Sequence, residues 1–304
     1  MFNGGGDVGS NSASSTVIIG AEAFENGIGG SIQNGVYIGR EVGKDSGNSS
    51  ADSKFNVHVG YRSMGNTVNG NNNVAVGYSS GQDASTSVAA NYNSFFGALA
   101  GVEHVSGDFN TFIGHNSGPA DNAASTGNNN TALGNGAQFT TANTTNEIVL
   151  GNSSIATLRC QVQTITALSD ERDKSEIVDL DSGLDLINSL KPRKFVWDPR
   201  EEVVYTREEK VTPAPTDTPT DLGSPLPRDT EEIIKIAHTV IPSTAGIKDV
   251  GFIAQELATV DDDFLRLVNS SNPEKLQASY GRLIPVLVKA IQELSAKVTA
   301  LENA

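Results

Sequence analysis

The sequence predicts a mainly β repeat shaft over residues 1–168 and an α+β domain over residues 169–304 that ends in a coiled-coil helix. Three observations lead to this prediction. The composition changes abruptly near residue 168, a glycine-anchored repeat fills the first part, and apolar residues near the C-terminal end follow a heptad spacing.

The composition separates the two parts. Residues 1–168 hold 5 Lys or Arg, 11 Asp or Glu and 26 of the 31 glycines, whereas residues 169–304 hold 16 Lys or Arg and 25 Asp or Glu. The net charge of -15 disfavours nucleic acid and anionic membranes as partners. Cys160 is the only cysteine, so no disulfide within the chain is expected. The first residues have no basic segment and no apolar core, so a signal peptide is not expected. No apolar run approaches the roughly 18 residues needed to span a bilayer, so insertion into a membrane is not expected either.

The first part repeats around one glycine per unit, which we take as position 0. These glycines are Gly20, Gly39, Gly60, Gly77, Gly97, Gly114, Gly134 and Gly151. Position −1 is apolar in all eight units, from Ile19 to Leu150, and position −3 is most often Val, Thr or Ile. Asparagine recurs at position −4, and a small residue is usual at position +3. Such regularity disfavours the alternative of a disordered linker rich in Gly, Asn and Ser.

Each unit predicts one short strand and a turn. Positions −1 and −3 lie on the same face of a strand, and we expect both to point into the core. The glycine allows a positive φ or a close approach of the backbone, and asparagine tolerates the left-handed region and bonds its own backbone. A strand of about four residues needs neighbours to offset its ordering, so the units predict a β-roll or β-helix built together with symmetry mates.

The unit from Asn73 to Gly81 resembles the head repeats of trimeric autotransporter adhesins, and similar repeats occur in phage tail fibres. The spacing here is longer and less regular than in the adhesin heads. We therefore expect loops of varied length to protrude between the strands.

At the composition boundary the chain runs Leu168-Ser169-Asp170-Glu171-Arg172-Asp173-Lys174. Taken alone, these residues favour a helix start with Ser169 as the N-cap and acidic residues in the first turn. The reciprocal capping box is absent, because Arg172 occupies the place of the Glu or Gln.

Three later segments change the interpretation. Residues 190–197 predict a helix end followed by a strand, residues 249–257 a strand entering a helix, and residues 280–287 the start of a long helix. Together with the S-D-x-R-x-K start and G-F-I-A-Q-E centre, this order resembles the self-cleaving intramolecular chaperone domain of phage endosialidases and related tailspikes. The resemblance covers residues 169–304.

The resemblance implies a domain that trimerises, holds three chains in register while the shaft folds, and then cuts itself off. It implies Ser169 as the nucleophile, Lys174 as the base and a cut between Leu168 and Ser169. The activity would be that of a serine endopeptidase with a Ser-Lys dyad, acting once on its own chain.

The chemistry of this pair is reasonable. A serine hydroxyl needs a base, and lysine is a base only when neutral. The two residues are five apart, so neither a regular helix nor a regular strand joins them, and a turn or a neighbouring chain must do so. We therefore hypothesise that the active arrangement forms only in the assembled trimer. Asp170, Arg172, Gln255 and Glu256 are possible supporting residues. A solvated surface charge explains Arg172 equally well, and a structural helix start is the favoured interpretation of Gln255 and Glu256.

Residues 282–304 predict the coiled-coil helix, with a seam at Ile284, Leu287, Ile291, Leu294, Val298 and Leu301. Ile or Val alternating with Leu favours two strands by itself, so the trimer rests on the resemblance and on the shaft. A helix packed on its own domain is the alternative. Residues 198–247 predict an extended arm with strands at 202–205 and 233–237 and a mobile tip at 212–227, which holds five of the eleven prolines.

The sequence suggests no metal site and no cofactor, because the four histidines lack ligand spacing and no nucleotide motif occurs. Asp261, Asp262 and Asp263 lack the further ligands of a calcium loop and are interpreted as surface charge. If the shaft binds a receptor, Tyr61, Tyr78 and Tyr92 are candidates, although each of them also suits packing.

We therefore expect a homotrimeric tail fibre or tailspike protein of the virion, assembled in the host cytoplasm. Its partners would be other phage tail proteins and a host cell-surface glycan or protein, with no nucleic acid. The alternative is a trimeric bacterial surface adhesin with a borrowed trimerising domain and no cleavage. A membrane-tethered transcription factor, as in the myelin regulatory factor family, would need a DNA-binding domain that the sequence does not suggest.

Overall fold

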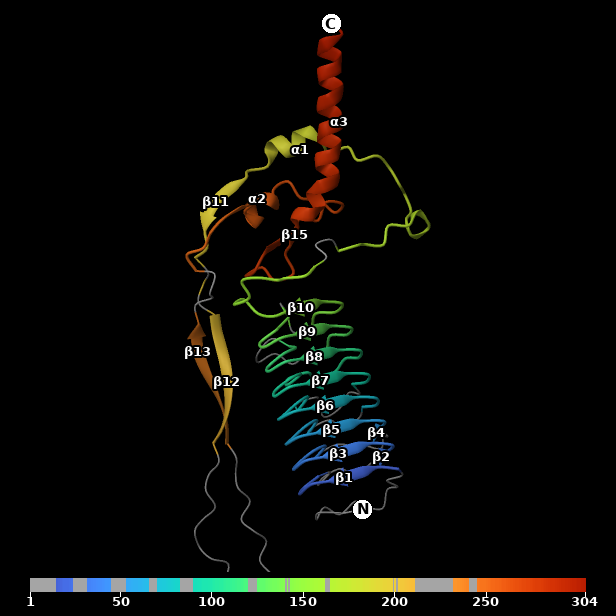
Figure 1. Ribbon diagram of the computed structural model, residues 1–304, viewed down its shortest axis with the longest axis vertical. Helices are drawn as coiled ribbons and strands as arrows, with labels where there is room; N and C mark the ends of the chain where they lie inside the picture. Colours follow the sequence, from blue (N-terminus) through green and yellow to red (C-terminus); the bar gives the residue numbers. More distant parts are fainter. Residues whose placement is uncertain are drawn as a thin grey trace, which may run out of the picture.

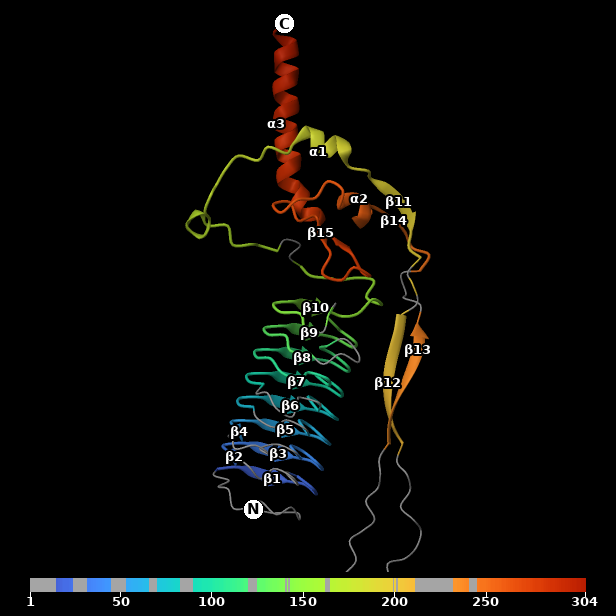
Figure 2. The same ribbon diagram turned by 180° about the vertical axis from the view of Figure 1, so that it is seen from behind.

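The computed structural model describes residues 15–23, 32–44, 53–65, 70–82, 90–119, 125–139, 141, 143–161, 165–198, 200, 202–210, 232–240 and 245–304, with the backbone alone for 202–210 and 232–240. A stack of short strands forms the N-terminal part, and a mixed part with a long protruding helix follows it (Figures 1 and 2). Most of the loops expected to protrude between strands lie outside the described residues.

The stack is one parallel sheet. Its eight strands are β1 (Val17–Ile19), β3 (Val36–Ile38), β5 (Val57–Val59), β6 (Val74–Val76), β7 (Ser94–Phe96), β8 (Thr111–Ile113), β9 (Thr131–Leu133) and β10 (Ile148–Leu150). Each strand pairs with the next at equivalent positions, as Val74 does with Ser94 and Val76 with Phe96. A second, two-stranded parallel sheet joins β2 (Ile32–Gln33) to β4 (Ser53–Lys54). The predicted repeat shaft is therefore confirmed as a parallel β-solenoid, and we call each strand of the larger sheet, with its flanking residues, a rung.

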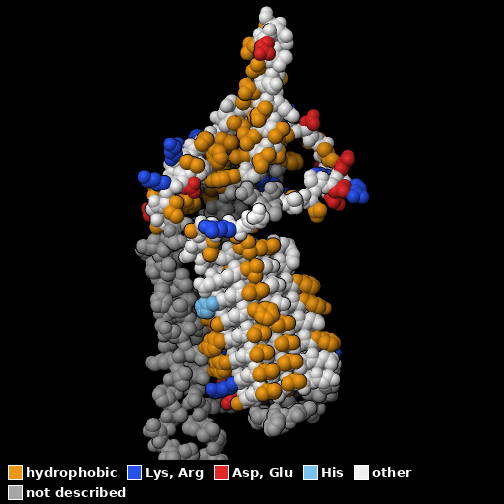
Figure 3. Space-filling model, viewed as in Figure 1, with side chains coloured by type: hydrophobic (Ala, Val, Ile, Leu, Met, Phe, Trp, Pro, Cys, Tyr) orange, Lys and Arg blue, Asp and Glu red, His pale blue; other side chains and the backbone are white. Residues whose placement is uncertain are grey.

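The prediction that positions −1 and −3 fill the core is wrong. The buried position is −2, the middle of the strand, which Tyr37, His58, Ala75, Phe95, Phe112 and Ala132 occupy. The residues at position +3 are also buried in the first seven units, from Ala23 to Ala137, and mostly small side chains there complete a narrow interior, whereas Ser154 of the last unit is exposed. The apolar side chains at −1 and −3 point the other way, and none of them is buried. The larger sheet therefore has an apolar outer face along its length, visible as rows in Figure 3.

The asparagines at position −4 form a buried row that joins the rungs. Asn73 Oδ1 accepts from the backbone amide of Asn93 at 2.9 Å, and Asn93 Oδ1 accepts from that of Asn110 at 2.9 Å. The same bond recurs between Asn56 and Asn73, between Asn110 and Asn130, and between Asn130 and Glu147. Each amide also donates to a carbonyl, as Asn93 Nδ2 does to Gly107 at 2.9 Å. The asparagines therefore bond the neighbouring rung, and the left-handed residue is the one before them, at position −5.

The repeat glycines allow the rungs to approach closely. Gly77 has φ +144°, and a Cβ there would lie 2.3 Å from the carbonyl oxygen of Gly97 in the next rung. Equivalent contacts with the next glycine's oxygen, at 2.0 to 2.5 Å, occur at Gly20, Gly39, Gly60, Gly97 and Gly114. These distances are far below van der Waals contact, so any side chain would push the rungs apart.

The C-terminal part has a small core of its own. An extended and mostly exposed segment leads to α1 (Leu184–Ser189), which packs on α3 (Leu283–Glu302). β11 (Arg193–Val196) pairs antiparallel with β14 (Lys248–Gly251), and α2 (Ala254–Leu257) follows. β15 (Val268–Asn269) and β16 (Gln277–Ala278) form a short hairpin before the 3-10 turn η2 (Tyr280–Arg282). Leu257, Leu265, Leu267, Leu283 and Val286 form the buried centre. The helix and strand boundaries predicted from residues 190–197, 249–257 and 280–287 are confirmed.

The two strands predicted between residues 198 and 247 are present and longer than expected. β12 (Glu202–Lys210) and β13 (Glu232–Val240) pair antiparallel along their whole length. This hairpin extends from the C-terminal part in the direction of the shaft (Figures 1 and 2). The predicted mobile tip at 212–227 lies outside the described residues.

The helix α3 uses two faces differently. Leu283, Val286 and Ala290 are buried against the domain, so the alternative of a helix packed on its own domain applies to this face. The whole predicted seam, from Ile284 to Leu301, is exposed, with Ile291 at 66 %. A regular apolar seam is therefore left without a covering element in the described part of the chain.

Substituting Asn93 with alanine should destabilise the shaft. The amide of Asn110 would lose its buried acceptor, which costs about 1–3 kcal/mol of unfolding free energy. Urea unfolding of the shaft followed by circular dichroism measures this. The exposed Asn135→Ala serves as control and should change the midpoint little. Equal midpoints for Asn93→Ala and the unmodified protein would contradict the role of the row.

Acid should weaken the shaft through two buried histidines. Burial lowers the pKa of His58 to about 3, and that of His104 to about 4 despite the Gly107 carbonyl. The unfolded chain binds these protons near pH 6.5 and the folded chain does not, so stability falls as the pH drops from about 6.5 towards 4. Each histidine contributes about 1.4 kcal/mol per pH unit. Urea titrations at several pH values measure how the unfolding free energy depends on pH. His58→Phe should make this slope smaller, because only His104 remains, and an unchanged slope would refute the assignment.

Candidate active site

The segment between Ser169 and Lys174 forms a single tight turn. Residues Glu171–Asp173 make the 3-10 turn η1, and Asp170 is its N-cap because its Oδ1 accepts from the amide of Arg172 at 2.9 Å. The amide of Lys174 closes the turn by donating to the carbonyl of Glu171 at 3.0 Å. The expected N-cap role of Ser169 is therefore wrong, since the next residue provides the cap and no α-helix follows.

This turn brings the two candidate catalytic side chains together. Lys174 Nζ lies 2.6 Å from Ser169 Oγ and 3.1 Å from the Ser169 carbonyl oxygen. The spacing of five residues left two ways to join the pair, a turn inside the motif or a neighbouring chain. In the structure a turn inside the motif makes the contact within one chain. In this bond Lys174 Nζ donates to Ser169 Oγ, and the two atoms lie within the distance over which a neutral lysine could instead accept the hydroxyl proton.

The surroundings of the pair are open in the single chain. Leu168, on the acyl side of the expected cut, is 97 % exposed, and Ser169 and Lys174 are exposed too. Apolar residues on either side, such as Ile165 and Val178, are also exposed. A lysine base needs a dry environment that favours its neutral form. Covering this segment would supply that environment.

Asp170 and Arg172 stabilise the turn as a pair. Arg172 donates to the Asp170 carboxylate through Nε at 3.0 Å and Nη2 at 2.6 Å. These bonds and the backbone amide hold the pKa of the Asp170 carboxyl below its ordinary value. Arg172 thus binds Asp170, the N-cap of the turn. Within the described residues it forms no hydrogen bond with the side chain of Ser169 or Lys174.

The structure does not bring Gln255 and Glu256 to the serine. Both lie on α2, and Glu256 forms an ion pair with Arg193 of β11, whose hydrogen bond lowers the pKa of the Glu256 carboxyl. Within the described residues no hydrogen bond joins either one to Ser169 or Lys174. The ion pair of Glu256 is structural, in line with the interpretation of these residues as a helix start.

Several structural contacts of the domain were not predicted. Asp261 accepts from the amides of Leu267 and Val268, so at least this member of the acidic run is a loop cap and not a plain surface charge. Glu293 of α3 accepts from the amide of Leu184 at 2.8 Å and caps α1. The Tyr280 hydroxyl bonds the backbone of Phe252. Each contact joins residues distant in sequence or in a loop, which no local pattern reveals.

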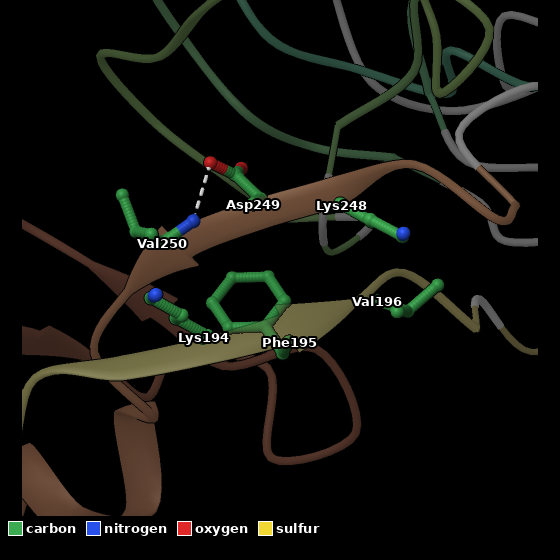
Figure 4. A pocket seen from close by; sticks show the side chains of 6 residues that line it. All are labelled: Lys194, Phe195, Val196, Lys248, Asp249 and Val250. Carbon is green, nitrogen blue, oxygen red and sulfur yellow. Dashed lines mark hydrogen bonds between the residues drawn. The ribbon is translucent and has the colours of Figure 1, made fainter.

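A hollow of about 440 Å³ lies over the β11–β14 pair (Figure 4). Lys194, Phe195 and Val196 line it from one strand, and Lys248, Asp249 and Val250 from the other. The Asp249 carboxylate bends back to the amide of Val250 at 2.7 Å. The lining has no nucleophile paired with a base, so it lacks the elements of a second catalytic site.

Among the described residues, no group of three His, Cys, Asp or Glu side chains is placed to hold a metal ion. No helix in the described part of the chain is both long and apolar enough to cross a bilayer. Comparison of the chain with protein-family models, with curated proteins and with solved structures found no match. The geometry of the turn is therefore the main structural guide to function.

Substitutions at Asp170 test whether the cap positions the lysine. Asp170→Ala removes the acceptor that fixes the turn, and it should slow the cleavage expected between Leu168 and Ser169 at least about tenfold, in line with the loss of a positioned general base. Asp170→Asn keeps an oxygen at the cap and should stay within a few-fold of the unmodified rate. Quantitative gel analysis of cleavage during expression measures both. Equal rates for the two variants would exclude a positioning role.

Proposed function

We propose that this chain is a trimeric fibre protein of the phage tail fibre or tailspike type that attaches to a host surface. Its C-terminal domain acts as a folding chaperone and releases itself by cleaving the bond between Leu168 and Ser169. The observation that carries the proposal is the 2.6 Å contact of Lys174 Nζ with Ser169 Oγ, located where the solenoid part gives way to the helical part.

The proposed reaction uses only the chain's own atoms and water. Neutral Lys174 takes the proton of Ser169 Oγ, and this oxygen attacks the carbonyl carbon of Leu168. The new C–O bond forms an ester while the C–N bond to Ser169 breaks, and the lysine returns its proton to the leaving amine. Water then hydrolyses the ester. Because the attacked carbonyl directly precedes the nucleophile, proximity contributes without any binding step.

Exposed apolar surfaces on the chain support assembly with further copies. The outer face of the larger sheet carries apolar side chains along eight rungs. The seam of α3 is a second exposed apolar surface. Figure 3 shows both surfaces. Burying a Val, Leu or Ile side chain is worth roughly 1.5–3 kcal/mol. Another copy matches the rung spacing.

The proposal ties cleavage to assembly. A lysine base needs a site without water, but the segment around Ser169 is exposed in one chain. Neighbouring copies would therefore have to complete the site. Cleavage would then release the chaperone only after the three shafts have aligned. The alternative of a surface adhesin has the same assembly but no cleavage. A measurement of cleavage therefore separates the two proposals.

Expression of the whole chain followed by intact mass analysis tests the cleavage. We expect two fragments, residues 1–168 and 169–304. Ser169→Ala should leave one intact chain, and Lys174→Ala should slow cleavage about 10²-fold or more. Ser182→Ala and Lys191→Ala are matched controls, which should cleave normally. Full-length chain alone from assembled, unmodified protein would refute the proposal.

A seam variant tests the link to assembly. Ile291→Glu places a charge on the exposed seam of α3 and should prevent trimers, which sedimentation analysis measures. Cleavage should be lost together with the trimer. A monomer that cleaves at the normal rate would disprove the link to assembly while leaving the dyad intact.

A further inference from the structure

The residue before the asparagine row, at position −5, has a left-handed backbone in every rung. The eight residues are Ser15, Asn34, Phe55, Asn72, Tyr92, Phe109, Asn129 and Asn146, with φ between 55° and 62°. Five of them are Asn or Ser. Asparagine tolerates this region best among residues with a side chain, whereas a bulky aromatic there is an outlier.

The three aromatic residues at this position do not serve the core. Phe55, Tyr92 and Phe109 are 54 %, 54 % and 58 % exposed. Tyr92 and Phe109 stack on each other, which offsets part of their backbone cost. Phe55 has no ring partner among the described residues. An exposed ring in an unfavourable conformation indicates a role outside folding.

The spacing of the rungs places these rings in one row with a gap. Tyr92 and Phe109 lie on adjacent rungs, with centroids 5.0 Å apart and planes within 6° of parallel. Phe55 has the same φ as Tyr92, 58°, and lies two rungs before it. Two strand spacings are about 9.5 Å. Asn72, which is short, occupies the rung between, so the aromatic row lacks one ring at this place.

The gap has the size of one sugar ring. Carbon atoms pack best at about 3.5–4.0 Å, so two aromatic faces about 9.5 Å apart accommodate a single puckered ring between them. The negative face of an aromatic ring attracts the C–H groups of such a ring. The Asn72 amide makes no side-chain hydrogen bond within the described chain, so it offers both a donor and an acceptor to a hydroxyl group.

We propose that Phe55, Asn72 and Tyr92 bind one pyranose ring of a neutral glycan. The walls and the floor of the gap are uncharged, and the net charge of -15 disfavours an anionic sugar. The proposal deepens the proposed attachment function by naming the class of receptor, and it is independent of the cleavage.

A second row of aromatic side chains has no such gap. Tyr61 and Tyr78, at position +1, stack on adjacent rungs, and the guanidinium of Arg62 lies 5.1 Å from the Tyr61 ring centre. Arg62 is itself paired with the buried carboxylate of Glu41 at 2.7 Å. The residues of this row already contact one another and Arg62 within the chain, so packing explains the row.

The shaft provides its own test variants, because asparagine already occupies position −5 in four rungs. Phe55→Asn and Tyr92→Asn each remove one wall and suit the left-handed backbone. Asn72→Phe fills the gap with the missing ring. The control is Phe109→Asn, which removes a ring behind Tyr92 and leaves the gap. Each variant is prepared as whole chain, and its cleavage is measured by mass on the same sample.

The probe is an array of immobilised neutral oligosaccharides and their sialylated counterparts. The unmodified protein should bind neutral glycans, and Phe55→Asn, Tyr92→Asn and Asn72→Phe should each weaken binding at least tenfold. Phe109→Asn should bind within a few-fold of the unmodified protein. No binding to any neutral glycan, including the case in which partner copies cover the row, would overturn the proposal. So would undiminished binding by Asn72→Phe. If the unmodified protein cleaves normally but binds no neutral glycan, the glycan proposal fails and the proposed cleavage stands.

Discussion

Each buried asparagine amide at position −4 holds two neighbouring rungs at once, and the order of the shaft depends on this bond. Its oxygen accepts from the next backbone amide and its nitrogen donates to a carbonyl, so a polar group inside the solenoid is satisfied without water. A slip of one residue between rungs would leave both groups unpaired. The row therefore fixes the register that the three-residue strands, by themselves, are too short to enforce.

The sequence predicted the repeat correctly but placed its inside and outside wrongly. A period of two residues shows that positions −1 and −3 share a face, and it does not show which face is buried. The decisive signal was the asparagine at −4, which lies on the same side as −2. We expected it to bond its own backbone, whereas its bonds to the next rung place that side inside. The mixed residues at −2, from Ala75 to Phe95, gave no apolar pattern that would have revealed the core.

The candidate site was predictable in its residues and not in its shape. The spacing between Ser169 and Lys174 excluded a regular helix or strand, so a turn was one of two remaining possibilities. The cap that creates the turn is Asp170, and its bonds with Arg172 depend on side-chain geometry that residue types alone do not fix. Glu256 is engaged elsewhere, because Arg193, 63 residues before it in the chain, binds its carboxylate.

The column of repeat glycines also affects how such a shaft can evolve. A mutation that adds a side chain at the column glycines from Gly20 to Gly114 is strongly unfavourable, because the new Cβ atom would lie only 2.0 to 2.5 Å from the next carbonyl oxygen. Duplication or deletion of a complete unit meets no such barrier, because the new neighbours present the same amides and carbonyls. The shaft can therefore be lengthened or shortened by whole units, in steps of about 4.8 Å, while the contacts between the remaining rungs are kept.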